Sequence, residues 1–129
     1  MTGNADFTDL RSPFLWTLSF SNLVWSYQSI SSVNNANFGR AGHTSSPVGD
    51  GQYYIFGGRY ADGQPVSSSQ LAVLNPFDSS LTAIAPDQNS PQPANRYAHC
   101  AVTRSDGKLV VFGGTSDASN SNADMNDVW

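Results

Sequence analysis

Two histidines and a single cysteine are the side chains of this sequence with the greatest potential for chemistry. His43 and His99 could bind a metal ion as a pair, and His99 stands next to Cys100, as a base stands next to a nucleophile. Zinc, however, would need further nitrogen or sulfur ligands, and only Cys100 remains. Neighbouring residues of a strand point to opposite faces, so His99 could not activate Cys100. We therefore predict no catalytic residue, no metal site and no cofactor.

The spacing of the histidines indicates a structural role instead. His99 follows His43 by 56 residues, and four other features recur at that offset. A fixed period of about this size is typical of solenoids and propellers. Cys100 stands where the other repeat has Thr44, and we predict a small buried thiol there. The other recurring features are Arg40 and Arg96, Phe56 and Phe112, Gly57-Gly58 and Gly113-Gly114, and Asp50-Gly51 and Asp106-Gly107.

A polar segment near the end of the sequence alternates oxygen-bearing side chains, as a calcium loop does. The turn glycine and the bidentate glutamate of such a loop are missing, so we predict a solvated loop without metal. The four residues are Asp117, Ser119, Ser121 and Asp124.

The composition favours an all-β fold with many turns. Of the 129 residues, 39% are hydrophobic and 12% are charged, and the net charge is −4. The acidic residues are all aspartate and Lys108 is the single lysine, so good helix formers are scarce. The acidity argues against a nucleic-acid surface and against docking to anionic lipid. We predict no membrane insertion, because polar residues interrupt the apolar run at 13–25 and it is too short to span a bilayer. We predict no signal peptide, because the run lacks a basic segment before it beyond Arg11. Whether the compartment is the cytoplasm or the exterior stays open.

Each repeat has the pattern of a meander of four short strands. In the central copy we predict strands at 43–48, 52–57, 71–75 and 81–85. A Gly-Asp-Gly turn joins the first two, and Pro76, which cannot donate to a ladder, begins the turn between the last two. The next copy repeats the pattern from His99, with a second strand from Lys108 and the start of a third at Asp127.

The front of the chain is in the same register. Residues 15–18 align with 71–74, and Trp25 aligns with Leu81 at the fourth strand. We therefore expect a leader at 1–14 that corresponds to a loop between strands two and three. The outer half of a repeat (strands three and four) follows at 15–38, a complete repeat at 39–94, and the inner half of the next at 95–129.

This pattern resembles the kelch repeat of β-propeller proteins. The resemblance lies in Arg-x-x-His followed by an apolar run ending in Gly-Gly, in "NDVW" at 126–129, and in Trp25, which resembles the family's fourth-strand tryptophan. Leu81 replaces that tryptophan in the central copy. The resemblance implies a partial kelch-type β-propeller of four-stranded antiparallel blades, with one full blade, two half blades and the first strand of each innermost. It also implies that Arg40, His43, Gly57, Gly58, Arg96, His99, Gly113 and Gly114 are residues of the fold.

The glycine pairs have a physical explanation. Two glycines at a strand end allow φ > 0 and the close approach of a neighbouring strand. Phe56 and Phe112, which precede the pairs, are then expected between blades as core.

The long loops indicate where a ligand would bind. In a four-stranded meander, the connection between strands two and three and the exit from strand four lie at the same end. The long loops of this chain fall at those positions, at 28–39, 59–70, 86–95 and 115–126. Because loops on a rigid scaffold carry binding, we place the ligand surface on this long-loop face, with Arg59, Tyr60 and Asp62 as candidates.

Two functions are consistent with the sequence. The first is a non-catalytic kelch module that binds a protein partner through the long-loop face. The alternative is part of a secreted or cell-surface propeller that recognises carbohydrate or resembles the copper-radical oxidases of the family. Those oxidases pair a cysteine with tyrosines and histidines, and Tyr53, Tyr54 and Cys100 are available here, although the repeat already accounts for both histidines.

The repeat number raises a question of assembly. Repeats cannot bury their faces alone, and closed propellers have about four to eight blades. We therefore expect either further blades in a longer chain, or copies that associate head to tail. In the second case the first two strands of one half blade would pair with 15–18 and 24–28 of another copy.

Overall fold

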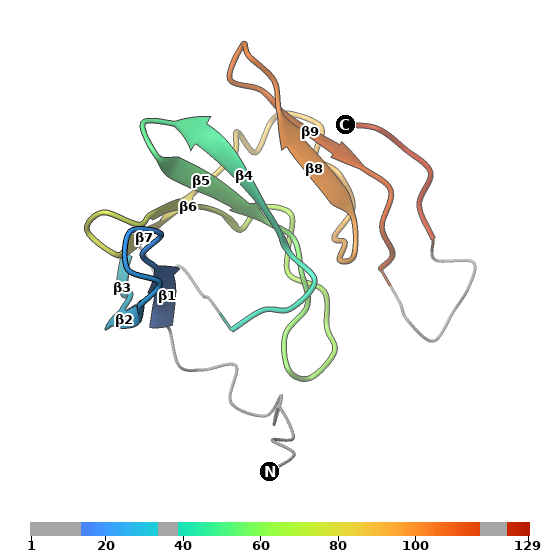
Figure 1. Ribbon diagram of the computed structural model, residues 1–129. Helices are drawn as coiled ribbons and strands as arrows, with labels where there is room; N and C mark the ends of the chain where they lie inside the picture. The colour runs from blue at the N-terminus through green and yellow to red at the C-terminus, as the bar shows by residue number, and fades with distance from the viewer. Residues whose placement is uncertain (1–13, 34–38, 117–123) are drawn as a thin grey trace.

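The computed structural model describes residues 14–33, 39–116 and 124–129 (Figure 1). Within these ranges the regular elements are β-strands, and the fold is all-β, as predicted. Nearly all of the expected leader, and the candidate calcium ligands Asp117, Ser119 and Ser121, lie outside the described residues. The strands are β1 (Phe14–Leu18), β2 (Trp25–Ser29), β3 (Ser31–Val33), β4 (Thr44–Gly49), β5 (Gln52–Phe56), β6 (Leu71–Asn75), β7 (Ser80–Ile84), β8 (Cys100–Thr103) and β9 (Leu109–Phe112).

Strands β4 to β7 form an antiparallel meander, which we call the central unit together with its loops (residues 39–94). Each strand pairs with the next along the chain, and Thr44 of β4 lies opposite Phe56 of β5. All four strands begin and end within one residue of their predicted bounds. The tight turn between β4 and β5 has φ of 48° at Asp50 and 72° at Gly51, which confirms the expected positive-φ hairpin turn.

A fifth strand extends this sheet in a way that the sequence did not predict. β3 pairs in parallel with β7, with Ser31 opposite Ser80. The remaining strands form two separate antiparallel hairpins. β1 and β2 form the N-terminal hairpin (residues 14–29), in which Leu18 lies opposite Trp25.

β8 and β9 form the second hairpin, which we call the C-terminal unit together with its flanking segments (residues 95–129). Cys100 lies opposite Phe112, and β8 runs beside β4 of the central unit (Figure 1). The backbones of Val111 and Trp129 exchange two hydrogen bonds, of 3.0 and 2.9 Å. Residues 127–129 therefore pair with β9, without forming a regular strand.

The core lies between the N-terminal hairpin and the central unit. Leu81 is fully buried, and Leu15 of the hairpin packs against the cluster to which Leu81 belongs. Burying a leucine side chain stabilises a fold by roughly 1.5–3 kcal/mol. The buried members of the cluster are Ile30, Ile55, Ala72 and Leu81, with Leu15, Leu74 and Ala83 partly buried against them.

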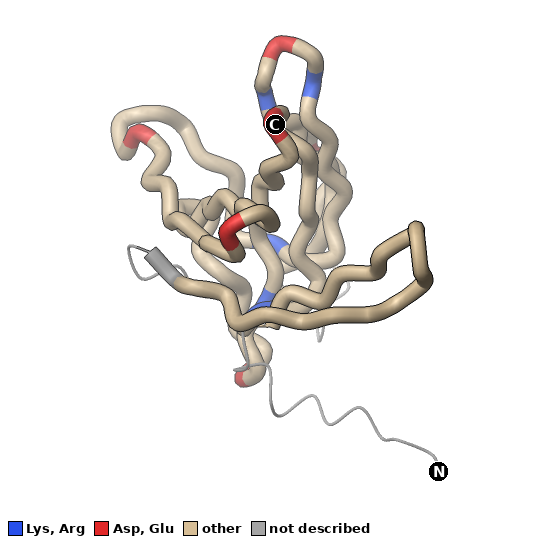
Figure 2. The backbone as a smooth tube through the Cα atoms, turned by 60° about the vertical axis from the view of Figure 1, so that its left-hand side comes forward, with Lys and Arg blue, Asp and Glu red and all other residues tan. Residues whose placement is uncertain are grey.

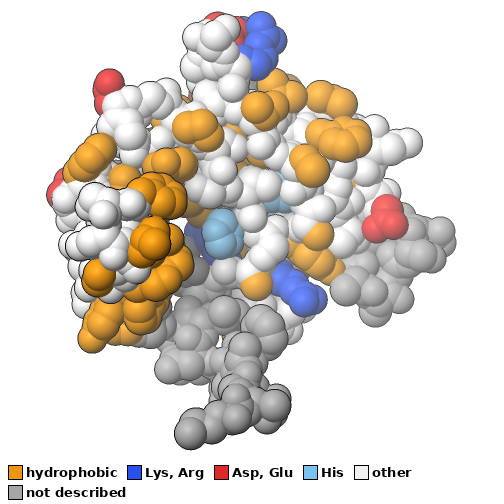
Figure 3. All heavy atoms as spheres, viewed as in Figure 1, with side chains coloured by type: hydrophobic (Ala, Val, Ile, Leu, Met, Phe, Trp, Pro, Cys, Tyr) orange, Lys and Arg blue, Asp and Glu red, His pale blue; other side chains and the backbone are white. Residues whose placement is uncertain are grey.

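Outside this core, hydrophobic side chains gather at two places on the face seen in Figure 3. One lies over the N-terminal hairpin and the other near β8 and β9. The expectation that both repeat phenylalanines are core is half right: Phe56 is 6% exposed, but Phe112 is 56% exposed. The difference arises because the C-terminal unit packs over Phe56, while no described segment covers Phe112.

Candidate functional site

The arginine of each Arg-x-x-His motif holds its own repeat together. The side chain of Arg96 is fully buried and donates to the carbonyl oxygen of Gly113 at 2.9 Å. Its guanidinium also makes two bonds to the carboxylate of Asp127, of 2.7 and 2.9 Å. Arg40 bonds in the same way to the carbonyl oxygen of Gly57, at 3.2 Å, and to that of Gln70, at 3.3 Å. Each arginine therefore ties the entry of a unit to the end of its second strand.

The backbone of the same motif reaches the preceding repeat. The amide of Gly58 donates to the carbonyl oxygen of Arg96 at 2.9 Å, and the amide of Ala98 donates to the carbonyl oxygen of Gly42 at 2.9 Å. We call this contact between the central and C-terminal units the inter-repeat joint. The guanidinium of Arg96 thus stabilises one unit while its carbonyl group binds the other.

The side chain of His99 completes the inter-repeat joint. Its ring is 6% exposed, and Nε2 lies 2.8 Å from Oγ1 of Thr44. The ring also packs edge-on against Phe56, with the two centroids 5.4 Å apart. Burial, and next the charges of Arg96 and His43, lower the pKa of His99 to about 4. The imidazole is therefore neutral at physiological pH and acts in the joint as a packed, hydrogen-bonded group.

The glycines of the first pair have separate roles in this joint. A Cβ on Gly57 (φ +63°) would meet the carbonyl oxygen of Arg96 and Cε1 of His99, both at 2.5 Å. Gly57 therefore makes room for the next repeat. A Cβ on Gly58 (φ +97°) would meet the carbonyl oxygen of Ala41 at 3.0 Å, within its own unit. Both the positive φ and the close approach expected from the sequence are present.

The two histidines differ in their surroundings. Within the described ranges no cluster of three or more histidine, cysteine or aspartate side chains could hold a metal ion. His43 is exposed, unlike His99, and its pKa is lowered, chiefly by partial desolvation. The histidines occupy the same repeat position but have different surroundings, because His99 packs on Thr44 and Phe56 of the central unit.

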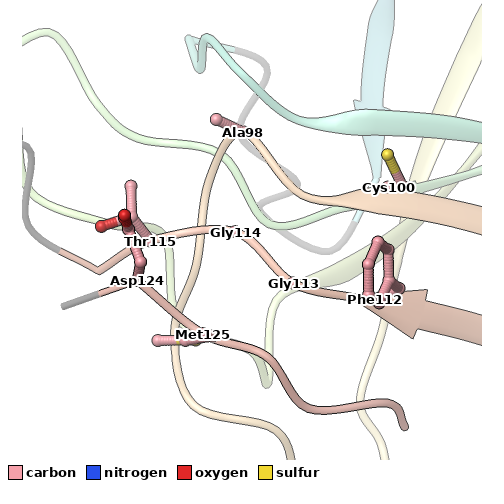
Figure 4. Close-up of a pocket in the computed structure, with 8 residues that line it drawn as sticks. All are labelled: Ala98, Cys100, Phe112, Gly113, Gly114, Thr115, Asp124 and Met125. Atoms are coloured by element: carbon pink, nitrogen blue, oxygen red, sulfur yellow. The ribbon is translucent and has the colours of Figure 1, made fainter. Parts of the chain in front are cut away.

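Cys100 corrects another expectation. It is an exposed free thiol, not a buried one, although the preceding residue, His99, is buried. Thr44, its counterpart, is partly covered because His99 packs on it. Cys100 instead lines an open pocket of about 380 Å³ (Figure 4). The pocket is lined by Ala98, Cys100, Phe112, Gly113, Gly114, Thr115, Asp124 and Met125.

The candidate binding residues lie on the long-loop face. The guanidinium of Arg59 lies over the ring of Tyr97, 5.1 Å from its centroid, although Arg59 is exposed. The backbone of Arg59 also bridges to Ala41 and to Pro65. Arg59 is therefore fixed at the point where the loops of two repeats meet.

The other two candidates lie in the loop that follows Arg59. The hydroxyl of Tyr60 donates to Oε1 of Gln70 at 2.6 Å, and the carboxylate of Asp62 accepts from the amide of Gln64 at 2.9 Å. A further bond joins this loop to the next one, because the amide of Ser68 donates to Oδ1 of Asn95 at 2.9 Å. The loops at 59–70 and 86–95 therefore meet.

Three residues of this region were not found by sequence reasoning. Tyr97 is buried beneath Arg59, Thr44 binds His99, and Asp127 pairs with Arg96. Their counterparts in the other repeats differ: Ala41 stands for Tyr97, Cys100 for Thr44, and Leu71 for Asp127. A search for repeated residues therefore passes over them, and only a buried arginine that requires an acceptor could have indicated Asp127.

Charged residues are sparse along the described part of the chain. Figure 2 shows lysine and arginine as isolated segments, with no continuous basic stripe among the described residues. Within the described part of the chain, no helix is long and apolar enough to cross a membrane.

Comparisons with known proteins add no relative. No protein-family model matches the chain, and no curated protein matches it significantly. The resemblance to kelch repeats therefore depends on the repeated residues of this chain itself.

Proposed function

We propose that the chain is a segment of kelch-type propeller and acts as a non-catalytic module that binds a protein partner through its long-loop face. The observation that carries this proposal is the inter-repeat joint. The 96–99 segment of the C-terminal unit binds the central unit at two places. The carbonyl oxygen of Arg96 accepts from the amide of Gly58 in the Gly-Gly pair, while the amide of Ala98 donates to Gly42 and His99 contacts Thr44 at the start of the first strand. This contact joins the two-stranded sheet of the C-terminal unit to the four-stranded meander of the central unit, and in the proposed propeller it would join one blade to the next.

The character of the long-loop face supports a protein ligand. Arg59 is exposed but held by Tyr97, so little conformational entropy is lost when it binds. Arginine and tyrosine are enriched in the residues that dominate protein–protein affinity. Asp62 lies in the same loop and adds a charge of opposite sign. The face therefore combines a fixed cation, an aromatic ring and a carboxylate.

The test is a binding measurement with matched variants. A partner captured by the wild-type chain would be purified, and its affinity for Arg59→Ala, Tyr60→Ala and Asp62→Ala would be measured. We expect a loss of about tenfold or more for at least one of these variants, which corresponds to roughly 1.4 kcal/mol. Lys108→Ala and Asp106→Ala, in the turn between β8 and β9 at the opposite end, should bind as the wild type does. Unchanged affinity in all three loop variants would place the binding surface elsewhere.

A carbohydrate-binding or oxidase-like propeller is the second candidate. The observation in its favour is the exposed aromatic cluster of the N-terminal hairpin, where the rings of Trp16 and Tyr27 lie 4.9 Å apart and Phe14 packs edge-on against Tyr27. Exposed patches of this kind mark interaction sites. Glycan-array binding that is lost in Trp16→Ala, or turnover that requires added copper, would favour this candidate over the first.

A further inference from the structure

The two Gly-Gly pairs have unequal surroundings, although they hold the same place in the repeat. At Gly57, a Cβ would meet two atoms of the C-terminal unit at 2.5 Å. At Gly113, which has nearly the same φ of +64°, the nearest described atom is the carbonyl oxygen of Met125, at 3.4 Å. The space beside Gly57 is filled by the 96–99 segment, whereas the space beside Gly113 is the open pocket next to Cys100.

This pocket is the counterpart of the space that His99 occupies. Its wall contains the aromatic ring of Phe112, the thiol of Cys100 and the glycine pair at 113–114 (Figure 4). A histidine that entered it would pack on Phe112 as His99 packs on Phe56. The pocket residues Cys100, Phe112, Gly113 and Gly114 each follow Thr44, Phe56, Gly57 and Gly58 by 56 positions.

The chain carries a second segment that matches this pocket. Residues 40–43 repeat the Arg-x-x-His motif, and the side chain of His43 is exposed. We propose that copies of this chain associate head to tail, with segment 40–43 of one copy seated in the Cys100 pocket of another. The proposal rests on the kelch-type function above, because it uses the same joint between repeats. In it, the imidazole of His43 takes the place of His99 and the thiol of Cys100 takes the place of the Thr44 hydroxyl.

The side chains that differ between the two joints compensate for one another. In the inter-repeat joint, a Cβ on Gly42 would lie 3.5 Å from Cβ of Tyr97, so a large residue faces a glycine. In the proposed contact, Ala98 replaces Gly42 and Ala41 replaces Tyr97. The added methyl group on one side thus meets a much smaller side chain on the other, and the backbones can approach to a similar distance.

A second pair of surfaces would be buried by the same arrangement. Trp16 and Trp25 are 58% and 62% exposed, yet their counterparts Ala72 and Leu81 are buried in the core cluster. That cluster includes Leu15 of the N-terminal hairpin and Ile30, which directly follows the hairpin. Their counterparts 56 positions later are Leu71 and Pro86, both half-buried. The tryptophans of the incoming copy would therefore cover Leu71 and Pro86, and would remove apolar surface from water on both sides.

Residues 127–129 compete with this association. They pair with β9, at the strand position that β1 of the incoming copy would take, since Val128 corresponds to Trp16 in the repeat. The incoming copy must therefore displace them. Arg96 would keep an acceptor, because the carbonyl oxygen of Phe14 would lie where Arg40 finds that of Gln70. The ion pair between Asp127 and Arg96 thus holds residues 127–129 on β9 and opposes the association.

The test measures mass and thiol reactivity on the full chain. Sedimentation velocity from low to high micromolar concentration should show a rising mass, and the rate of maleimide labelling at Cys100 should fall in parallel. Gly113→Ala should abolish both effects, because its Cβ would meet the carbonyl oxygen of the incoming Arg40. Gly107→Ala is the matched control, since Gly107 also has a positive φ (+80°) but has no atom within 4 Å of its Cβ position. Asp127→Ala should release residues 127–129 and lower the concentration at which half the chains associate, by about tenfold.

Three results would overturn the proposal: a monomer at all concentrations for both the wild type and Asp127→Ala, a rise in mass that Gly113→Ala leaves unchanged, or full reactivity of Cys100 in the associated fraction. Melting curves of each variant show that it is folded. Tyr60 and Asp62 take part in neither contact, so the binding test of the proposed function gives a separate result. A monomer that binds its partner contradicts only the association, and association without partner binding contradicts only the interaction module.

Discussion

Oγ1 of Thr44 and Nε2 of His99 lie 2.8 Å apart, although the two residues belong to different repeats. The contact joins the first strand of the central unit to the entry of the C-terminal unit. A neutral hydrogen bond of this kind contributes about 1 kcal/mol, and the burial of the ring against Phe56 adds to it. The histidine of the motif therefore stabilises the stacking of one repeat on another, in addition to its own repeat.

Replacing each histidine in turn should show whether stability depends on the contact between repeats, which His99 makes, or on the histidine of the motif in either repeat. We expect His99→Ala to lower the free energy of unfolding by about 2–3 kcal/mol, because it leaves a cavity and removes the acceptor or donor of Thr44. His43→Ala should cost less than about 1 kcal/mol at concentrations where the chain is monomeric, since His43 is exposed. Urea unfolding of both variants checks this. Equal losses would show that the contact with Thr44 is not what makes His99 important.

The lowered pKa of His99 predicts a loss of stability in mild acid. The folded chain holds this histidine neutral down to a pKa of about 4, whereas in the unfolded chain it takes up a proton near its ordinary pKa of 6.5. The stabilisation is therefore complete above pH 6.5 and is lost progressively as the pH falls toward 4. The difference between the two pKa values corresponds to about 3 kcal/mol.

Unfolding curves measured from pH 7.5 to 4 check this dependence. The variant His99→Gln should flatten this dependence of stability on pH. The variant His43→Gln should remove a smaller part of the dependence, because the pKa of His43 is also lowered. Asp127 has a lowered pKa because Arg96 and Trp129 bond to its carboxylate, so its stabilisation is lost only below its ordinary pKa of 3.8. A slope that survives in His99→Gln would assign the effect to another group.

The two first glycines of the pairs should respond differently to the same substitution. Gly57→Ala places a Cβ 2.5 Å from a backbone carbonyl oxygen of the next repeat, so we expect a loss above about 4 kcal/mol or failure to fold. Gly113→Ala carries the same positive-φ strain, about 1–2 kcal/mol, but meets its nearest atom at 3.4 Å. Thermal melts at low concentration compare them. Similar losses would mean that φ alone, and not the close approach, requires the glycine.

The strands of the central unit could be predicted because their signals are local. Short apolar runs end at glycine, proline and aspartate residues, and those residues determine turns by their own backbone preferences. β3 could not be predicted in this way. Its sequence, Ser-Ser-Val, has no distinct pattern, and its pairing with β7 depends on where the chain passes after the N-terminal hairpin.

The site was predicted where the repeat itself defines it and missed where repeats differ. Gly57 and His99 follow from the period of 56 residues, and their close contact explains why both recur. Burial of Cys100 and Phe112 was wrongly inferred from the same period, because the exposure of a residue depends on the unit packed beside it. The stacking of Arg59 on Tyr97 has no counterpart in the sequence pattern, since alanine holds the place of Tyr97 in the other repeat.

The buried arginine gives the last prediction. Arg96 is fully buried and donates to the carbonyl oxygens of Ala94 and Gly113 and to both carboxylate oxygens of Asp127. Lysine keeps the charge but lacks the planar fork, so Arg96→Lys buries an ammonium group that cannot reach all of these acceptors and leaves the buried carbonyl oxygen of Gly113 or the carboxylate of Asp127 unpaired; it should cost about 3 kcal/mol or more.

Two further variants test whether geometry or charge is responsible. Asp127→Asn should cost less than Arg96→Lys, because the amide oxygen still accepts one bond and the side chain of Asp127 is 42% exposed. Arg104→Lys is the matched control: Arg104 lies 3.2 Å from Asp106 at an exposed hairpin tip, and its replacement should cost less than about 0.5 kcal/mol. The denaturant guanidinium chloride is a salt and would screen these charges, so unfolding is measured in urea. If Arg96→Lys unfolded at the same urea concentration as the wild type, a positive charge at position 96 would be enough to stabilise the fold. The hydrogen bonds of the planar guanidinium group would then contribute nothing to stability. In that case the recurrence of arginine, rather than lysine, at 40 and 96 would need a different physical cause.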